Sequence, residues 1–168
     1  MPLALRHLLA IAALPFVVAM LVPMWLARGN GVALRLGTTT PKLLLQIAGA
    51  LLLLIGLALF AASLQRFVRD GRGTLAPWDP PGQLVLGGPY RYVRNPMISG
   101  VIFLLFGEGL ILTSVPHLEW AVTFLAINCV YIPLLEEPQL RQRFGDSYVE
   151  YCKHVPRFIP RLRPWSKP

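Results

Sequence analysis

Charge is scarce in this sequence: Asp, Glu, Lys and Arg make up 14% of its 168 residues, whereas 55% are hydrophobic. An average soluble domain has about 25% charged residues, so the composition excludes an ordinary soluble domain and indicates one small membrane domain. Cysteine and histidine are also rare, with two and three copies, and their scattered positions match no metal-ligand spacing. The sequence therefore predicts neither a disulfide framework nor a bound metal.

Acidic residues are rarer than basic ones. The sequence has eight Asp and Glu and sixteen Lys and Arg, which gives a formal net charge of +8. Binding to nucleic acid is one common reason for such an excess. Here, however, the basic residues flank apolar runs and do not alternate with aromatic residues over a soluble fold. We therefore expect no nucleic-acid partner.

Apolar runs are abundant, and four of them predict transmembrane helices, at residues 8–26, 43–64, 97–113 and 120–135. The first run contains two prolines that should kink it. It resembles a signal peptide, but it exceeds the usual signal core and no Ala-x-Ala site follows, so we interpret it as a retained helix. The last two runs are joined by six residues, 114–119, which predicts a tight helical hairpin.

The basic residues predict the orientation of these helices. If the N-terminus is cytoplasmic, thirteen of the sixteen Lys and Arg lie on the cytoplasmic side, and Arg28, Arg35 and Lys42 lie on the other. We therefore expect an all-α, multi-pass membrane protein of a bacterial inner membrane, with about four transmembrane helices and both termini cytoplasmic. In this single domain, 1–168, the parts are two helices (1–66), a cytosolic loop (67–96), the hairpin (97–135) and a cytosolic tail (136–168).

The hairpin should bring two polar segments to one membrane face. Residues 88–97, Gly-Pro-Tyr-Arg-Tyr-Val-Arg-Asn-Pro-Met, precede it, and Glu136 and Glu137 follow it. A helix rises about 1.5 Å per residue, so two legs of similar length return the chain to the face from which it started. Charged groups at that depth must face water, each other or a polar ligand. The sequence thus predicts a polar pocket at the membrane edge, which the turn-rich loop 70–83 should also border.

The tail should form an amphipathic segment on the same face. Pro138 is well placed to start a new helix, and a break is expected at Gly145. Residues 155–161 read as an extended arm that can fold back over the pocket. Apolar residues recur at helical spacing through this segment, at Leu140, Phe144, Tyr148, Tyr151 and Val155.

Each part of this pocket also has a plainer interpretation. Arg91 and Arg94 could anchor the chain at lipid headgroups, as arginines at span edges usually do. Glu136 and Glu137 could form structural salt bridges with those arginines, and the tyrosines on this face could belong to an interfacial aromatic belt. Two arginines opposite a carboxylate pair nevertheless favour ligand binding, because adjacent like charges need cationic partners.

Glu108 is a separate candidate, because it lies inside the third apolar run between two glycines. A carboxylate within a membrane span is a functional candidate by default. It could equally join two helices through a hydrogen bond.

The order of these motifs resembles that of the integral-membrane methyltransferases of the isoprenylcysteine carboxyl methyltransferase and phospholipid methyltransferase group. The resemblance covers about residues 88–160, from the Gly-Pro-Tyr-Arg segment through the hairpin and Glu-Glu-Pro to Phe-Gly-x-x-Tyr-x-x-Tyr and Val-Pro-Arg. It implies S-adenosylmethionine as methyl donor, bound at the cytosolic edge by the Arg-x-Pro region and the two glutamates. Prenylcysteine enzymes typically have Arg-His-Pro-x-Tyr; here Asn95 and Ile98 replace the His and the Tyr, and Asn-Pro-Met looks closer to the phospholipid branch.

The residue chemistry on this face agrees with that donor, which presents an ammonium, a carboxylate, ribose hydroxyls, an adenine ring and a sulfonium. A glutamate would receive the ammonium or ribose, an arginine or backbone N–H groups the carboxylate, and a tyrosine the adenine. An ionised acceptor could attack directly, whereas an amine or phenol would need a proton acceptor such as Glu108. The candidate donor-binding residues are Gly88, Pro89, Tyr90, Arg91, Tyr92, Arg94, Pro96, Glu136, Glu137 and Tyr148, and the candidate catalytic residues are Arg94, Asn95 and Glu108.

The apolar residues above the pocket predict a lipophilic small-molecule or lipid acceptor that enters from the bilayer. Two other functions stay open. Membrane sterol reductases share a similar C-terminal pattern, including Tyr151-Cys152, and would use NADPH, although two glutamates are unfavourable next to its extra phosphates. A non-catalytic scaffold whose basic tail binds anionic membrane lipid is the second.

Overall fold

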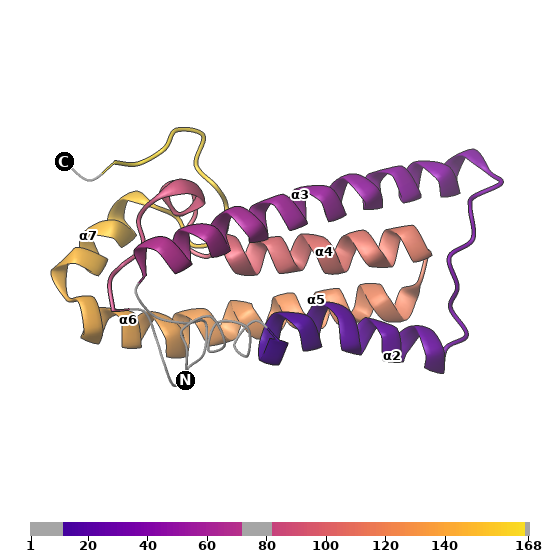
Figure 1. Ribbon diagram of the computed structural model, residues 1–168, viewed down its shortest axis with the longest axis horizontal. Helices are drawn as coiled ribbons and strands as arrows, with labels where there is room; N and C mark the ends of the chain where they lie inside the picture. The colour runs from indigo at the N-terminus through magenta and orange to yellow at the C-terminus, as the bar shows by residue number, and fades with distance from the viewer. Residues whose placement is uncertain (1–11, 72–81, 167–168) are drawn as a thin grey trace.

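The computed structural model describes residues 12–71 and 82–166, and every regular element in these two ranges is a helix (Figure 1). This confirms the all-α expectation for the described residues. The start of the first expected span, most of the loop 70–83, and the basic residues Arg6, Arg72 and Lys167 lie outside them.

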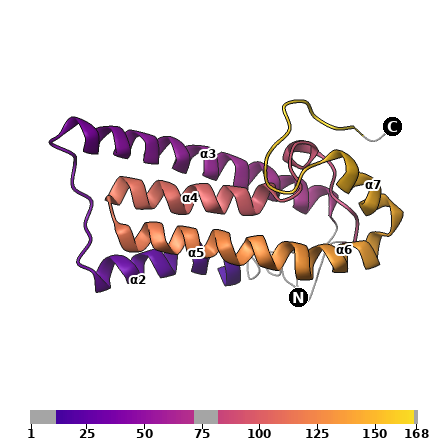
Figure 2. The ribbon, with the colours of Figure 1, turned by 180° about the vertical axis from the view of Figure 1, so that it is seen from behind.

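The helices lie side by side along one axis, in the spatial order α3, α4, α5 and α2 (Figures 1 and 2). Two of them are long and apolar enough to cross a membrane, Thr40–Asp70 (α3) and the continuous helix Val115–Phe144. Two shorter apolar helices, Pro15–Gly29 and Pro96–Leu112 (α4), run alongside. The second expected span is thus extended at both ends, because α3 continues beyond its leucine-rich core into polar residues.

Glycines let α3 and α4 pack backbone against backbone. Gly49 and Gly56 of α3 face Gly107 and Gly100 of α4. A Cβ atom on Gly56 would lie 2.7 Å from the Gly100 carbonyl oxygen, and one on Gly49 would lie 2.8 Å from that of Gly107. Small residues spaced by two helical turns on each partner are a typical way for membrane helices to approach closely. This seam fixes α4, and with it the start of the hairpin.

The hairpin is tighter than the sequence predicted. Only Thr113 and Ser114 separate α4 from α5 (Val115–Tyr131), so the expected loop 114–119 is wrong. Thr113 adopts a left-handed conformation with φ of 51°, which ends α4 in a sharp turn. Proline is compatible with the first turn of a helix, so Pro116 does not prevent α5 from starting five residues before the predicted start.

Polar residues near that turn dock the N-terminal helix, which is π-helical over Ala12–Leu21 (η1) and α-helical over Val22–Gly29 (α2). In a π-helix the carbonyl of Val18 would accept a hydrogen bond from the backbone N–H of residue 23, but Pro23 has no N–H. The Trp120 side-chain N–H donates to this carbonyl at 3.0 Å. The buried His117 contacts the Pro23 carbonyl at 3.1 Å through Nε2. His117 therefore belongs to the packed interior of the bundle and not to a loop.

The fourth helix does not end at residue 135, and Pro138 does not start a new one. The chain stays helical through a π-helical turn, Ile132–Glu136 (η3), into Glu137–Phe144 (α6). Pro133 and Pro138 each remove one backbone donor, and a widened turn between them lets the helix continue without those bonds. The expected break at Gly145 is confirmed, because its φ of 53° separates α6 from Asp146–His154 (α7).

Substitution of Gly56 by alanine tests the α3–α4 seam. The added methyl would meet backbone atoms of α4 at 2.7 and 2.8 Å, which cannot rotate away. We expect Gly56→Ala to destabilise the protein by about 1–3 kcal/mol, the usual cost of overpacking, and to lower the thermal unfolding midpoint in detergent.

Gly29→Ala is the matched control, because a Cβ there meets nothing within 4 Å. It should leave the midpoint unchanged or raise it, since alanine favours helix. Equal unfolding midpoints for Gly56→Ala and Gly29→Ala would contradict close backbone packing of α3 against α4 at Gly56.

Candidate functional site

The polar residues gather at one end of the bundle, where four segments meet. These are the C-terminal end of α3, the loop with a short 3-10 helix at Gly88–Arg91 (η2), the α6–α7 pair, and the C-terminal arm 155–166 (Figures 1 and 2). The hairpin does return the chain to its starting end, as the leg lengths predicted. The end of α3 at Asp70 and the arm that begins at Val155 thus share one site, although more than eighty residues separate them in sequence.

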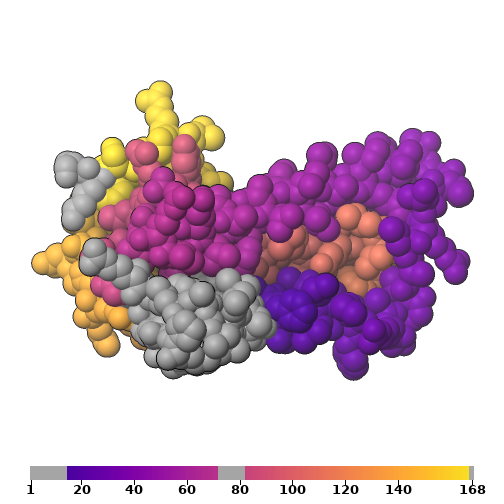
Figure 3. Space-filling view, viewed as in Figure 1, coloured from indigo at the N-terminus to yellow at the C-terminus, as the bar shows by residue number. Residues whose placement is uncertain are grey.

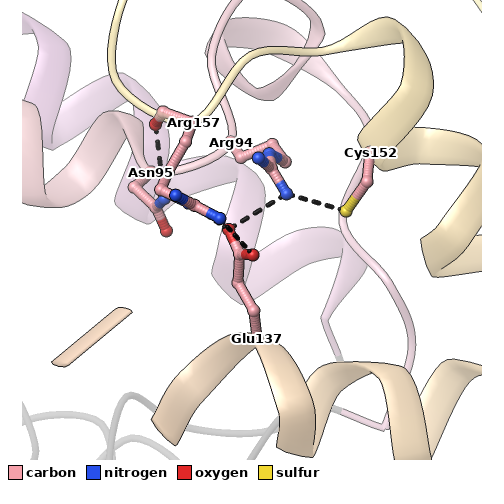
Figure 4. Close-up of polar contacts among 5 residues, drawn as sticks. All are labelled: Arg94, Asn95, Glu137, Cys152 and Arg157. Carbon is pink, nitrogen blue, oxygen red and sulfur yellow. Dashed lines mark hydrogen bonds and ion pairs between the residues drawn. The ribbon is translucent and has the colours of Figure 1, made fainter. Parts of the chain in front are cut away.

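Glu137 is the centre of this site (Figure 4). Its side chain projects from α6 and is buried, with the whole residue 3% exposed. Arg157 of the arm binds the carboxylate with two bonds, Nε to Oε1 at 2.6 Å and Nη2 to Oε2 at 2.7 Å. Arg94 of the loop approaches Oε1 through Nη1 at 3.0 Å. Two guanidinium groups therefore neutralise one buried carboxylate, and the hydrogen bond to Glu137 raises the pKa of Arg157.

Arg94 is held on several sides. Its side chain is 11% exposed, and Nη1 also lies 2.8 Å from the Cys152 sulfur of α7. Its backbone N–H donates to the Pro156 carbonyl of the arm at 2.9 Å. The Nε atom is buried, and no described residue forms a hydrogen bond with it. Arg94 thus faces the interior of the site with one buried donor unpaired among the described residues.

The arm folds back over the loop, as the sequence predicted for 155–161. Three backbone hydrogen bonds join the two segments. The Asn95 amide adds a bond to the Arg157 carbonyl at 3.3 Å, and the Arg91 Nε–H donates to the Trp165 carbonyl at 2.7 Å. The backbone bonds run from Arg94 to Pro156, from Arg161 to Tyr92 and from Trp165 to Arg91.

Aromatic residues pack beneath this layer. Tyr148, Tyr151 and Val155 form a buried cluster with Trp165, so the amphipathic stripe of the tail does pack inward. The Tyr151 hydroxyl donates to the Tyr90 carbonyl at 2.6 Å. Burial raises the pKa of Tyr90, Tyr148 and Tyr151 well above the usual range. These hydroxyls therefore stay neutral near pH 7 and can donate hydrogen bonds but cannot act as bases.

The two adjacent glutamates differ in their surroundings. Both oxygens of Glu137 are occupied by arginine, whereas among the described residues no hydrogen bond or ion pair reaches the half-buried Glu136. After burial, the charge of Glu136 is the second reason why the pKa of Tyr90 is raised, so the two side chains are neighbours. Of the two carboxylates, Glu136 is thus the one without a partner in the described part of the chain.

The remaining candidates divide into two groups. Gly88, with φ of 58°, lets η2 approach α3, because a Cβ there would lie 2.9 Å from Cγ of Arg66. Pro89 lies in η2, the buried Pro96 starts α4, and Tyr92 is 38% exposed. Glu108 lies thirteen residues along α4 from Asn95, which is roughly 20 Å at the helical rise. The structure therefore does not bring Glu108 together with the others.

Three residues of the site were absent from the candidate set: Cys152, Arg157 and Trp165. The Val-Pro-Arg motif contained the signal for Arg157, since an arginine directly after a proline-bounded turn can reach back to the carboxylate pair. Cys152 and Trp165 had no comparable signal, because their contacts depend on how the arm folds.

Arg157→Lys tests whether the two-bond contact with Glu137 holds the arm. Lysine keeps the charge but cannot form both bonds at once. Loss of one charge-assisted bond, about 1.5–3 kcal/mol, should lower the unfolding midpoint and expose the arm to protease.

Arg163→Lys serves as the control, because this exposed arm residue has no hydrogen bond or ion pair with the described part of the chain. The same protease sensitivity in both variants would show that the bond to Glu137 does not hold the arm.

Comparison with known proteins identifies a family and a curated relative. The family model described as phospholipid methyltransferase matches residues 44–147, from α3 to the start of α7. A curated relative, protein-S-isoprenylcysteine O-methyltransferase B of Arabidopsis thaliana, is 34% identical over 79 residues. That match covers 46% of this chain and 40% of the relative, so the chain matches less than half of that protein's length.

Proposed function

The chain belongs to the phospholipid methyltransferase family, and we propose that it transfers a methyl group from S-adenosylmethionine to a lipophilic acceptor at the membrane edge. Family membership supports membrane methyltransferase activity, and it favours this function over the NADPH-dependent reductase and the non-catalytic scaffold. The donor, the acceptor class and the site residues are the parts that we add.

One observation supports the choice of site: a carboxylate, Glu136, and a guanidinium donor of Arg94 have no partner in the described part of the chain, beside a cluster in which two arginines share the Glu137 carboxylate. The half-buried Glu136 has no partner among the described residues, and the buried Nε of Arg94 has none either. Buried polar groups are normally paired, so the unpaired Nε of Arg94 suggests a polar ligand, and Glu136 is a half-buried carboxylate at the same end of the bundle. S-adenosylmethionine carries the complementary groups, an ammonium and a carboxylate, which fits these residues.

We propose that Glu136 binds the donor ammonium or ribose hydroxyls and that Arg94 binds its carboxylate, with Tyr90 against the adenine. Glu137 then acts as a positioning residue, because its oxygens are already occupied by Arg94 and Arg157. The bound donor supplies an electrophilic methyl group on its sulfonium. The arm and the aromatic cluster would exclude water from one side of the site and fix the donor relative to an acceptor, and alignment of this kind can supply roughly 7–11 kcal/mol.

A general base is not part of this proposal. Asn95 cannot titrate near neutral pH, and its amide is used in the bond to the arm. The tyrosines of the site stay neutral because they are buried. Glu108 is roughly 20 Å away along α4, and we assign it no role in methyl transfer. The arrangement therefore suits an acceptor that is already ionised or one that loses its proton to solvent.

The charge count supports a topology in which the site and both termini are cytoplasmic and the chain crosses the membrane four times. A lipophilic acceptor would then reach the site from the inner leaflet. Incubation of the purified protein with methyl-labelled S-adenosylmethionine and a native lipid extract tests the function. We expect label in a lipid-soluble product. A protein that binds the donor but labels no molecule of the extract would contradict an acceptor of this class.

The different surroundings of the two glutamates predict different effects of substitution. Glu136→Gln should weaken donor binding by roughly 10- to 150-fold, the equivalent of one charge-assisted hydrogen bond, and leave the unfolding midpoint nearly unchanged. Glu137→Gln should lower the unfolding midpoint in addition to weakening donor binding, because it leaves two arginines without their shared counter-charge. Equilibrium binding and thermal unfolding in lipid nanodiscs measure both effects.

Glu150→Gln is the matched control, because this exposed carboxylate of α7 pairs only with Lys153 and His154 among the described residues. It should change neither quantity. Donor affinity that is unaffected by Glu136→Gln would exclude Glu136 from the donor site.

A further inference from the structure

An open cavity of about 610 Å³ lies at the opposite end of the bundle from Glu137. It is bordered by the loop between α2 and α3, the first turns of α3, and the α4–α5 turn. The surface is hollowed at this end, between α3 and the loop that joins it to α2 (Figure 3). This cavity plays no part in the function proposed above, because α4 has 17 residues and places the two ends about 25 Å apart.

The walls of this cavity are fixed by hydrogen bonds. Gln46 of α3 is 7% exposed and holds the loop from inside. Its side-chain oxygen accepts from the Gly37 N–H at 2.9 Å, and its amide donates to the carbonyls of Arg35 at 2.8 Å and Ile111 at 3.0 Å. On the far wall the Ser114 N–H donates to the Gly109 carbonyl at 3.0 Å. The loop is therefore tied to both α3 and α4, and the cavity has a defined shape.

The lining combines positive charge with apolar surface. Arg35 and Lys42 both line the cavity, and no carboxylate in the described part of the chain forms an ion pair with either. Val32, Leu45 and Leu112 supply apolar wall next to them. Leu45 is 43% exposed and continues into the leucine-rich outer face of α3. Two uncompensated cations at the edge of a hydrocarbon-facing surface match an amphiphile with an anionic head.

We propose that this cavity binds the headgroup of an anionic membrane phospholipid. The phosphate would lie between Arg35 and Lys42, and an acyl chain would run along Leu45 onto the outer face of α3. Because the loop between α2 and α3 forms one wall, the lipid would hold that loop against the end of the bundle. The lipid is not the methyl acceptor, since its headgroup is a helix length away from the Glu137 site.

Native mass spectrometry of the protein in detergent, with added phosphatidylglycerol or phosphatidylcholine, tests this site. We expect the wild type to retain phosphatidylglycerol at least threefold more than phosphatidylcholine. Arg35→Gln and Lys42→Gln should each remove most of that preference. Arg28→Gln is the matched control, because Arg28 is exposed and basic at the same end but does not line the cavity.

Loss of the preference in Arg28→Gln to the same degree would overturn the proposal, because diffuse surface charge would then explain it. Retention of the preference in both cavity variants would overturn it as well. A second measurement compares the effect of inorganic phosphate with that of phosphatidylglycerol on the unfolding midpoint. If millimolar phosphate raises the unfolding midpoint as much as phosphatidylglycerol does, the site binds a free anion and the lipid assignment is wrong.

Discussion

The contacts of the buried Glu137 carboxylate with Arg94 and Arg157 are the interactions on which the polar end of the bundle depends. The carboxylate joins three segments that are far apart in sequence: α6, which carries it, the loop before α4 through Arg94, and the C-terminal arm through Arg157. A buried carboxylate is unfavourable without partners, so the three segments are stable together and not separately. The backbone pairing between loop and arm and the cluster around Trp165 follow from this arrangement. Glu136 and the Nε–H of Arg94 have no partner among the described residues, and we propose that a ligand binds them.

The apolar part of the bundle fixes the geometry of the end that contains Glu137. Close contact between Gly56 and Gly100 and between Gly49 and Gly107 holds α4 against α3, and the two-residue turn after α4 holds α5 against α4. The π-helical turn Ile132–Glu136 then lets the helix continue past Pro133 and Pro138. Because Glu136 and Glu137 lie in a continuous helix, their side chains leave it in different directions. This explains how adjacent residues of the same type have such different partners.

Much of this arrangement could be predicted from the sequence, because it depends on local hydrophobicity and helix length. The apolar runs located the helices, and the equal legs of the hairpin correctly brought Arg94 and Glu137 to one end. Local signals failed where tertiary contacts decide the outcome. The six residues from Ser114 to Glu119 were predicted to connect the two helices, but Val115–Glu119 belong to α5, and His117 is buried against the Pro23 carbonyl. Pro138 looked like a helix start, yet a widened turn lets the helix continue. Nothing local distinguishes Glu136 from Glu137, since the difference arises from Arg157, twenty residues further on.

We propose that this end of the bundle binds S-adenosylmethionine. Titration calorimetry of the protein in lipid nanodiscs, with S-adenosylmethionine and NADPH added in separate experiments, tests it most directly. We expect saturable binding of S-adenosylmethionine with one site per chain and no binding of NADPH. Saturable binding of NADPH, or of neither compound, would contradict it.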